Sequence, residues 1–404
     1  MRRPSTLLAV FITLLNDRVG ESLVFPLLPY LLAGLTDSGT TLGLLAGSYA
    51  LAQFLATPLI GALSDRFGRR PVIASCVAGT VLGLGLFATT LALPWPRGSL
   101  LPLLLLFVGR LIDGFSGGTA ATAGAVLADI SSPEKRAKAF GLIGVAFGLG
   151  FILGPALAGL LSQWNVLLPL WIAVAIAALN LLLVLLLLPE THPIASRRNL
   201  PRKRQLQPFA QLAKVFGNPK VGSLCAAFFL FFLAFNGFTA VLVLFFKQRF
   251  AWGPAPATLA FLIVGVVATV VQGGLIGPLV QRFGERRLSL CGLGLVLVGC
   301  LLIPAAPSGH AQPVVYSAVA LLACGTGLVT PCLRSLVSRR LDSDGQGAAL
   351  GSLQGLQSLG SFLGPPLMGL CYEQLGPSSP FLLASLLLIA VAALSANGTL
   401  KQAG

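Results

Sequence analysis

Long apolar stretches recur along the whole chain and are separated by short polar segments. Most of these stretches reach the roughly 20 residues that an α-helix needs to cross a bilayer. The pattern therefore predicts an all-α membrane protein with about twelve transmembrane helices. The predicted spans are residues 7–32, 41–62, 71–93, 100–129, 138–161, 166–188, 220–247, 257–280, 287–305, 313–339, 347–371 and 379–400.

The composition supports this prediction. The chain is 55% hydrophobic and only 10% charged, whereas a soluble domain is typically about 25% charged. Arg2 and Arg3 precede the first stretch, which is much longer than the apolar region of a signal peptide, so we expect a transmembrane helix there. The seven cysteines lie mostly inside spans as packing residues.

The net charge of +15 is distributed unevenly between the loops. Basic residues gather in every second loop, which argues against nucleic-acid binding. By the positive-inside rule, this asymmetry predicts a multi-pass protein of the cell membrane with both termini in the cytoplasm. The basic loop residues include Arg66, Arg69, Arg70, Lys135, Arg136, Arg282 and Arg286.

One long polar segment interrupts the pattern near the middle. Residues 189–220 carry seven Lys or Arg and one acid, Glu190. We expect a solvated linker that fixes topology and meets anionic lipid headgroups, with a dedicated regulatory site as the alternative. The predicted organisation is a six-helix bundle over 1–188, a cytoplasmic linker over 189–219 and a second bundle over 220–404.

The two halves share short motifs in the same order. "GALSDRFGRR" at 61–70 matches "GPLVQRFGERR" at 277–287, and "GFILGPALAG" at 150–159 matches "GSFLGPPLMG" at 360–369. The offsets are 216 and 210 residues. The chain therefore reads as a duplicated, pseudo-symmetric six-helix unit, the construction of many secondary transporters, whose substrate site lies between the repeats.

These motifs resemble those of a known family. "GALSDRFGRRPV" resembles the loop signature of the major facilitator superfamily, and "GFILGPALAG" resembles the motif of its proton antiporters. "FPLLP" at 25–29 and "GRLIDGFSGG" at 109–118 are similar to the twelve-helix, tetracycline-exporter-like branch. The resemblance implies a major facilitator fold and proton-coupled antiport that exports small amphipathic or hydrophobic compounds by alternating access.

The sequence departs from the tetracycline exporters in its second half. Those exporters carry a histidine and further acids in that half of the membrane. Here the two histidines, His192 and His310, lie in predicted loops, and we identify no acid within a predicted span after Asp129. The departure argues against tetracycline, or its metal chelate, as the substrate.

The 61–70 motif joins the second and third predicted spans by a very short loop. We expect Gly61 to permit close helix approach and Gly68 to adopt a positive φ. Asp65 is placed to accept hydrogen bonds from a helix N-terminus or a guanidinium. The resemblance implies that this cluster latches the halves in the outward-facing state, whereas topology-setting charge is the simpler interpretation. The candidate latch residues are Gly61, Asp65, Arg66, Gly68, Arg69, Arg70, Asp129 and Arg136.

In the second half Gln281 and Glu285 replace Asp65 and Arg69, so that copy of the loop motif is interpreted as degenerate. In the fifth span the glycines predict close helix packing, and Pro155 predicts a bend. Such a helix suits a moving seam between the halves, with ordinary packing as the alternative. The candidate antiporter-motif residues are Gly150, Gly154, Pro155 and Gly159.

Two predicted spans contain ionisable residues. Asp17 and Glu21 lie four apart and Arg110 and Asp113 three apart, so each pair shares a helix face. Because charge at the bilayer centre costs at least about 2.5–3.5 kcal/mol per group, such residues are usually interior and functional. We expect Asp17 and Glu21 to carry the proton and Arg110 and Asp113 to tune it. The alternative is a static ion-pair cluster.

Polar and aromatic residues in other spans are candidates for the substrate cavity, although each alone also suits helix packing. They are Asn16, Phe25, Phe235, Asn236, Gln272, Gln354 and Gln357. The expected partners are a small-molecule substrate, protons and membrane lipids, and we expect a monomer without nucleic acid.

The sequence contains neither a phosphate-binding loop nor a metal-ligand spacing, so we expect no cofactor and no metal site. No nucleophile–base pair is visible, so we do not expect an enzyme. The alternatives to an exporter are a facilitator or symporter of a native metabolite, sugar or lipid, and a membrane receptor that no longer transports.

Overall fold

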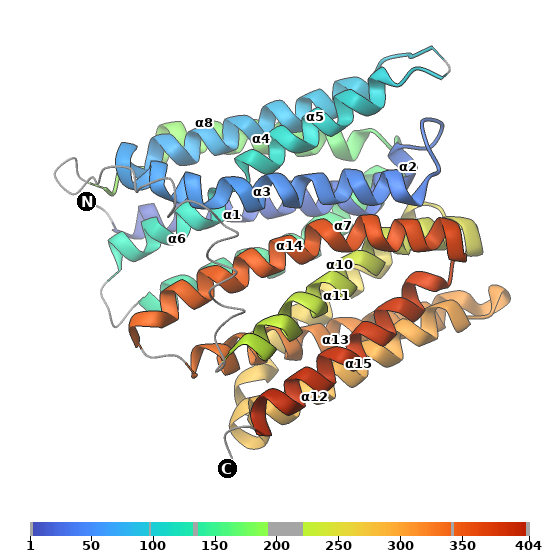
Figure 1. Ribbon diagram of the computed structural model, residues 1–404. Coiled ribbons are helices and arrows are strands. Elements are labelled where there is room, and N and C mark those ends of the chain that lie inside the picture. The colour runs from blue at the N-terminus through green and yellow to red at the C-terminus, as the bar shows by residue number, and fades with distance from the viewer. Residues whose placement is uncertain (1–2, 97, 132–135, 193–220, 341–342, 401–404) are drawn as a thin grey trace. The chain divides into compact units, whose positions relative to one another are not determined.

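The computed structural model describes residues 3–96, 98–131, 136–192, 221–340 and 343–400, which form helices and connecting turns and no strand (Figure 1). The chain divides into two compact units. Unit 1 contains residues 1–36 and 48–207, and unit 2 contains residues 37–47 and 208–404. The predicted linker lies mostly outside the described residues, so the boundaries at 188 and 220 stay a prediction.

Unit 1 is a bundle in which α1 packs against α7 and α8, while α4 packs against α5 and α8 (Figure 1). Prolines end α1 early, because Pro26 and Pro29 interrupt the backbone hydrogen bonding of the first span. Gly117 and Gly118 divide the fourth predicted span into two helices. The elements are α1 Arg3–Val24, η1 Phe25–Leu27, α2 Leu28–Leu31, α3 Gly39–Phe67, α4 Arg69–Ala92, α5 Leu101–Ser116, α6 Thr119–Ile130, α7 Arg136–Leu161 and α8 Leu168–Leu187.

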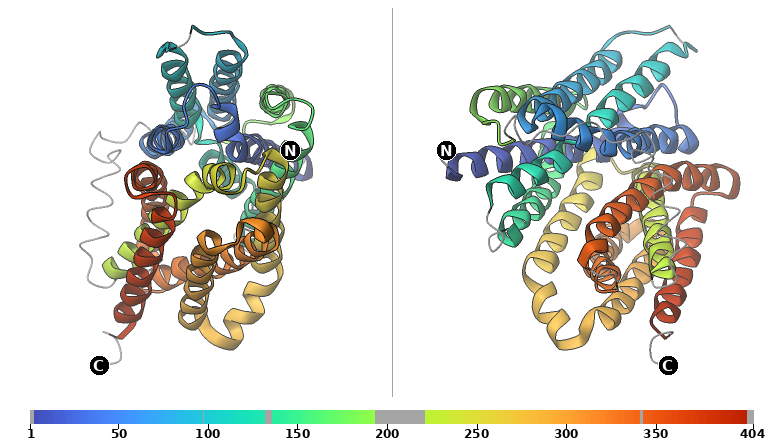
Figure 2. Two further views of the ribbon diagram at one scale, coloured as in Figure 1. Left: turned by 90° about the vertical axis from the view of Figure 1, so that its right-hand side faces the viewer. Right: turned by 60° about the vertical axis from the view of Figure 1, so that its left-hand side comes forward.

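Unit 2 packs α10 against α14 and α15, and α12 against α13. The helical stretch from residue 254 to residue 305 turns back sharply at Gly284, whose φ is +76°, and Figure 2 shows this hairpin in yellow. The elements are α10 Gly222–Phe250, α11 Pro254–Val270, η5 Val271–Leu275, α12 Ile276–Ala305, α13 Ala311–Ser338, α14 Ser343–Leu375 and α15 Ser379–Leu400.

The first turns of α3 belong to unit 2 because they pack closely on α14. A Cβ on Gly43 would lie 2.2 Å from the carbonyl oxygen of Pro365, and one on Gly47 would lie 2.6 Å from that of Phe362. Glu373 also accepts a hydrogen bond from the backbone N–H of Thr40 at 3.2 Å. Side chains at these two glycines would therefore separate α3 from α14.

Nine helices within the described part of the chain are long and apolar enough to cross a membrane, and the 254–305 stretch counts as one of them. Their outer faces carry exposed leucines such as Leu179, Leu186 and Leu386. This surface suits lipid contact, and the fold is that of a multi-pass membrane protein. The number of twelve spans stays a prediction.

Candidate functional site

Charged residues from α1 and α5 meet in a small pocket inside unit 1. The pocket is lined by Asp17, Glu21, Val24, Tyr49, Thr80, Leu84, Arg110 and Asp113. The four predicted proton-coupling residues are therefore all present on its wall. Glycines bring the elements together: a Cβ on Gly83 of α4 would lie 2.7 Å from the carbonyl oxygen of Gly109 on α5.

Arg18 links the two acids of α1. Its guanidinium donates to Asp17 Oδ2 at 2.7 Å and to Glu21, while its charged end lies 4.6 Å from the centre of the Phe147 ring on α7. The Arg18 side chain is 9% exposed and that of Asp17 is 10% exposed, so this ion pair is held away from solvent. Glu21 is more open, at 36%.

Asp113 has a looser partner. Its Oδ2 lies 3.6 Å from Nη1 of Arg110, and the two side chains are 11% and 13% exposed. Arg110 stacks its guanidinium 4.7 Å from the centre of the Tyr49 ring, and its Nε is buried without a partner among the described residues. Asp113 is thus a buried carboxylate whose ion pair is longer than a normal hydrogen bond.

The cluster holds unequal numbers of acids and bases. Three carboxylates (Asp17, Glu21, Asp113) accompany two guanidiniums (Arg18, Arg110). When all five groups are ionised, the cluster carries one net negative charge inside an apolar bundle. One bound proton would bring it to neutrality. The cluster can therefore accept a single proton without leaving an uncompensated positive charge.

The glycine motif of α7 holds α1 in place beside this cluster. A Cβ on Gly150 would lie 2.5 Å from the Cβ of Arg18, and one on Gly154 would lie 1.9 Å from Oγ of Ser22. The Ser22 hydroxyl donates to the Gly150 carbonyl at 2.7 Å. Both glycines therefore pack within unit 1, against α1, and Pro155 is buried beside them while Gly159 is half-buried.

We expect Gly154→Ala to destabilise the protein by about 1–3 kcal/mol, because the added methyl group overlaps Ser22 and forces α1 and α7 apart. Gly144→Ala is the matched control on the same helix, since a Cβ there meets nothing within 4 Å. Thermal unfolding in detergent gives the Tm of each variant. Equal Tm values for the two variants would contradict the close packing of α1 on α7.

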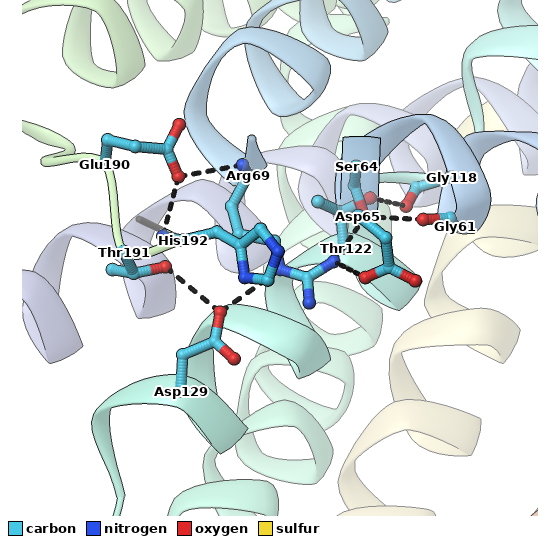
Figure 3. Close-up of polar contacts among 10 residues, drawn as sticks. All are labelled: Gly61, Ser64, Asp65, Arg69, Gly118, Thr122, Asp129, Glu190, Thr191 and His192. Atoms are coloured by element: carbon cyan, nitrogen blue, oxygen red, sulfur yellow. Dashed lines mark hydrogen bonds and ion pairs between the residues drawn. The ribbon is translucent and has the colours of Figure 1, made fainter. Parts of the chain in front are cut away.

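A second charge cluster surrounds Arg69 at the turn between α3 and α4 (Figure 3). Nη1 of Arg69 donates to Asp65 Oδ1 at 2.5 Å and to Ser64 Oγ at 2.6 Å, and Nε donates to Asp129 Oδ2 at 3.1 Å. The Arg69 side chain is only 9% exposed. Arg69 thus connects the ends of α3, α4 and α6.

Glu190, after α8, closes the cluster from the other side (Figure 3). Its carboxylate accepts hydrogen bonds from the backbone N–H groups of Arg69 at 2.9 Å and Arg70 at 3.2 Å. These are the first N–H groups of α4, which have no partner inside the helix. A carboxylate at a helix N-terminus is also favoured by the helix dipole. Sequence reasoning placed Glu190 in a linker and missed this capping role.

The other predicted latch residues have separate outcomes. Gly68 has a φ of +106°, which confirms the predicted backbone conformation. The expectation for Gly61 is wrong, because a Cβ there meets nothing within 4 Å. Arg66 is exposed and stacks on Phe67 at 5.1 Å. Arg70 donates to the Leu185 carbonyl, whereas the side chain of Arg136 lies outside the described residues.

Unit 2 has one ion pair at the place that corresponds to the Arg69 cluster, with the charges exchanged. Glu285, at the position of Arg69, forms an ion pair with Arg339 at 2.9 Å. By the 210-residue offset, Arg339 corresponds to Asp129. The interpretation of the loop motif as degenerate stays a prediction, but an ion pair between the two corresponding helix ends is present with opposite polarity. Gly284 also repeats the positive φ of Gly68.

The candidate cavity residues fall into both units. Asn16 and Phe25 belong to unit 1 and the other five to unit 2. Asn236 of α10 donates to Ser361 of α14 at 2.9 Å, and Phe235 stacks on Phe231 with 6.0 Å between ring centres. Gln272 is exposed in the π-helical turn η5, a type of irregularity frequent at functional sites.

Gln354 and Gln357 of α14 both accept hydrogen bonds from Arg334 of α13. Sequence reasoning did not single out Arg334. It also missed Tyr49 and Thr80, which complete the acidic pocket of unit 1. Arg334 could have been identified from the sequence as a candidate functional residue, because an arginine inside a predicted span is unusual.

The family model of the Major Facilitator Superfamily matches residues 7–365 and 273–397. The chain is 35% identical over 375 residues to the tetracycline resistance protein, class C, of Escherichia coli, covering 92% of this chain and 91% of that protein.

Two solved structures are also similar. The crystal structure of the human organic anion transporter MFSD10 (TETRAN) has a TM-score of 0.72 at 28% identity, covering 98% of this chain and 100% of that one. The nucleoside transporter NupG (D323A mutant) has a TM-score of 0.79 at 15% identity, covering 98% and 100%, and supports the fold alone. With a family match over most of its length, this chain belongs to the Major Facilitator Superfamily, a family of membrane transporters.

Proposed function

We propose that the protein is a proton-coupled exporter of small amphipathic compounds that works by alternating access. The observation that carries this proposal is the buried cluster of three carboxylates and two guanidiniums in unit 1. The similarity to tetracycline resistance proteins supports both the direction of transport, which is export, and the class of substrate, which is a small organic molecule.

The charge count provides the coupling step. Moving an uncompensated charge into a bilayer costs at least about 2.5–3.5 kcal/mol, so the cluster binds one proton in any state that closes it from water. Release requires the cluster to be opened to solvent again. We expect the proton on Asp113 rather than on Asp17 or Glu21, the carriers expected from the sequence. Arg18 pairs closely with both of those acids, whereas the ion pair of Asp113 with Arg110 is a 3.6 Å contact.

The Arg69 cluster supplies a switchable contact in this proposal. It fixes the ends of α3, α4 and α6 through groups that are partly exposed, since the side chains of Asp65 and Asp129 are 48% and 25% exposed. Such bonds are broken more readily than buried packing. We infer that the cluster holds unit 1 in one conformation of the transport cycle and is released in another.

The loop charges support an orientation for the chain. We infer that the Arg69 cluster, the linker and both termini face the cytoplasm, because Lys and Arg gather in every second loop and such loops are usually cytoplasmic. The apolar outer faces then contact lipid, and the basic linker meets anionic headgroups. We infer a monomer of two six-helix halves. The candidates for substrate contact stay the polar and aromatic residues of α10, α14 and η5 within unit 2, and Asn16 and Phe25 within unit 1.

The function is tested in proteoliposomes with an acidic lumen that contains a pH-sensitive dye. Tetracycline is the first probe because of the similarity to tetracycline resistance proteins, although the second half lacks the histidine and acids of those exporters. A lipophilic cationic dye is the second probe. We expect at least one of them to accumulate in the lumen while the lumen becomes more alkaline. A protonophore should abolish both signals, and protein-free vesicles provide the baseline. Entry only to equal concentration, without proton movement, would indicate a facilitator, and accumulation that requires the opposite gradient would indicate a symporter.

A further inference from the structure

Arg334 lies on α13, inside the predicted span 313–339, and is held by neutral partners. Its Nη2 donates to Oε1 of Gln357 at 2.6 Å and to Oε1 of Gln354 at 3.3 Å, both on α14. The charged end lies 5.7 Å from the centre of the Phe228 ring on α10. Three helices of unit 2 therefore fix the position of one guanidinium.

No carboxylate among the described residues forms an ion pair with Arg334. Its Nε is fully buried and has no hydrogen-bond partner in the same part of the chain. A half-buried cation without an anion is costly, so such groups are normally paired. The two glutamines lessen this cost but leave the positive charge uncompensated.

Two simpler roles do not account for this arrangement. An arginine that anchors a helix end at the membrane surface extends its charged group toward water, whereas Arg334 is turned onto α14 and an aromatic ring. A role in folding the six-helix unit is also unsupported, because by the 210-residue offset the corresponding residue in unit 1 is Gly124 of α6. Unit 1 forms without a cation at this place.

We propose that Arg334, Gln354 and Gln357 form a subsite that binds the anionic group of the substrate, a carboxylate or enolate on an otherwise apolar molecule. This inference rests on the proposed export function and names its substrate class. A guanidinium is suited to oxyanions because it presents several N–H donors in one plane. The two amide groups offer further N–H donors beside it.

Neighbouring residues suit the apolar part of such a molecule. Phe235 is half-buried on the same helix as Phe228, two turns farther along. Gln272 lies beside Gly327 of α13, seven residues before Arg334 and on the same helix face, because a Cβ on Gly327 would be 3.6 Å from its Cγ. The subsite therefore continues along α13 toward a second polar group.

Equilibrium binding to the full-length protein in nanodiscs tests the subsite without transport. The probes are fluorescein, an organic anion, and tetramethylrhodamine ethyl ester, a cation with the same xanthene ring. We expect Arg334→Gln to weaken fluorescein binding by about tenfold or more, as loss of a charged hydrogen bond does, and Arg334→Lys to weaken it less. Binding of the cation should stay the same or improve.

Arg249→Gln is the control, since it removes an exposed arginine at the opposite end of α10. It should leave the binding of both dyes unchanged. Thermal unfolding separates recognition from support of the fold: Arg334→Gln should not lower Tm, because it removes an uncompensated charge. A lowered Tm with equal weakening of both dyes would overturn the proposal, as would unchanged fluorescein binding or a wild-type protein that does not bind fluorescein.

The two proposals fail differently. If tetracycline or the cationic dye moves protons in proteoliposomes while Arg334→Gln leaves fluorescein affinity unchanged, the export function stands and the anion subsite is wrong. If fluorescein binding depends on Arg334 but no substrate moves protons, the subsite stands as a binding site and the proton-coupled function is wrong.

Discussion

Asp113→Asn is expected to abolish substrate-induced proton movement, lowering it at least tenfold in proteoliposomes, while the protein still binds substrate. The substitution leaves two carboxylates, Asp17 and Glu21, with two guanidiniums, so the cluster is neutral without a proton. A neutral cluster carries no net charge that is costly to bury, so it does not take up a proton when it is closed from water. The pH change in the lumen on substrate addition is the measurement.

Asp17→Asn removes one negative charge from the same cluster and should also lose proton movement. The two variants should differ in stability, because Asp17 pairs closely with the buried Arg18 at 2.7 Å, whereas the ion pair of Asp113 with Arg110 is longer, at 3.6 Å. We therefore expect a lower Tm for Asp17→Asn than for Asp113→Asn. Thermal unfolding of the two purified variants checks this order.

Asp37→Asn is the matched control for both variants. It also removes one carboxylate that forms an ion pair, but the side chain of Asp37 is 71% exposed, its partner is Lys247, and neither residue lines the pocket of unit 1. Asp37→Asn should show the same substrate-induced proton movement as the wild type. Full proton movement in Asp113→Asn together with loss in Asp17→Asn would assign the proton to Asp17 instead and contradict the role proposed for Asp113.

That the charged residues meet in one cluster was predictable, because exposing a charge to lipid costs free energy. Asp17, Glu21, Arg110 and Asp113 lie in apolar spans, and charges in such spans must face the protein interior and find each other. The turn at Gly68 was predictable for a similar reason, since few residues other than glycine tolerate a φ of +106°. In both cases the local sequence leaves few alternatives.

Other features depend on tertiary neighbours that the sequence does not specify. Arg334 lies five residues before the end of its predicted span, where an arginine resembles any positive charge near the membrane surface. Only the approach of α14 shows that Gln354 and Gln357 hold it inside. Glu190 caps α4 from 120 residues away. Gly61 was misassigned because a glycine in a helix does not reveal which of its faces is packed.

Reversing the charge at Arg69 should disrupt the second cluster. In Arg69→Glu, a glutamate would face Asp65, Asp129 and the capping carboxylate of Glu190 without any cation in place. Removing one partner of a buried ion pair costs about 3–5 kcal/mol. We expect a value near the lower limit, because Asp65 and Asp129 are partly exposed. Tm in detergent and the amount of folded protein measure the effect.

Unit 2 shows how that loss could be repaired. There the corresponding positions hold Gln281, Glu285 and Arg339, and the ion pair between the last two runs in the opposite sense. The triple variant Asp65→Gln, Arg69→Glu, Asp129→Arg transfers this set into unit 1. It restores one cation beside the new glutamate and removes the two competing acids, so we expect it to recover much of the Tm lost in Arg69→Glu.

Recovery should be incomplete, because Glu190 remains at the N-terminus of α4 and repels Glu at position 69. A double variant that combines Asp65→Gln with Arg69→Glu is the control, since it removes one repulsive acid without supplying the cation. The triple variant must exceed it in Tm if the exchanged pair forms. Equal Tm values would show that the polarity of the pair is fixed by its surroundings in each unit. In that case Arg69–Asp129 and Glu285–Arg339 would occupy corresponding positions in the two units, but neither ion pair could replace the other.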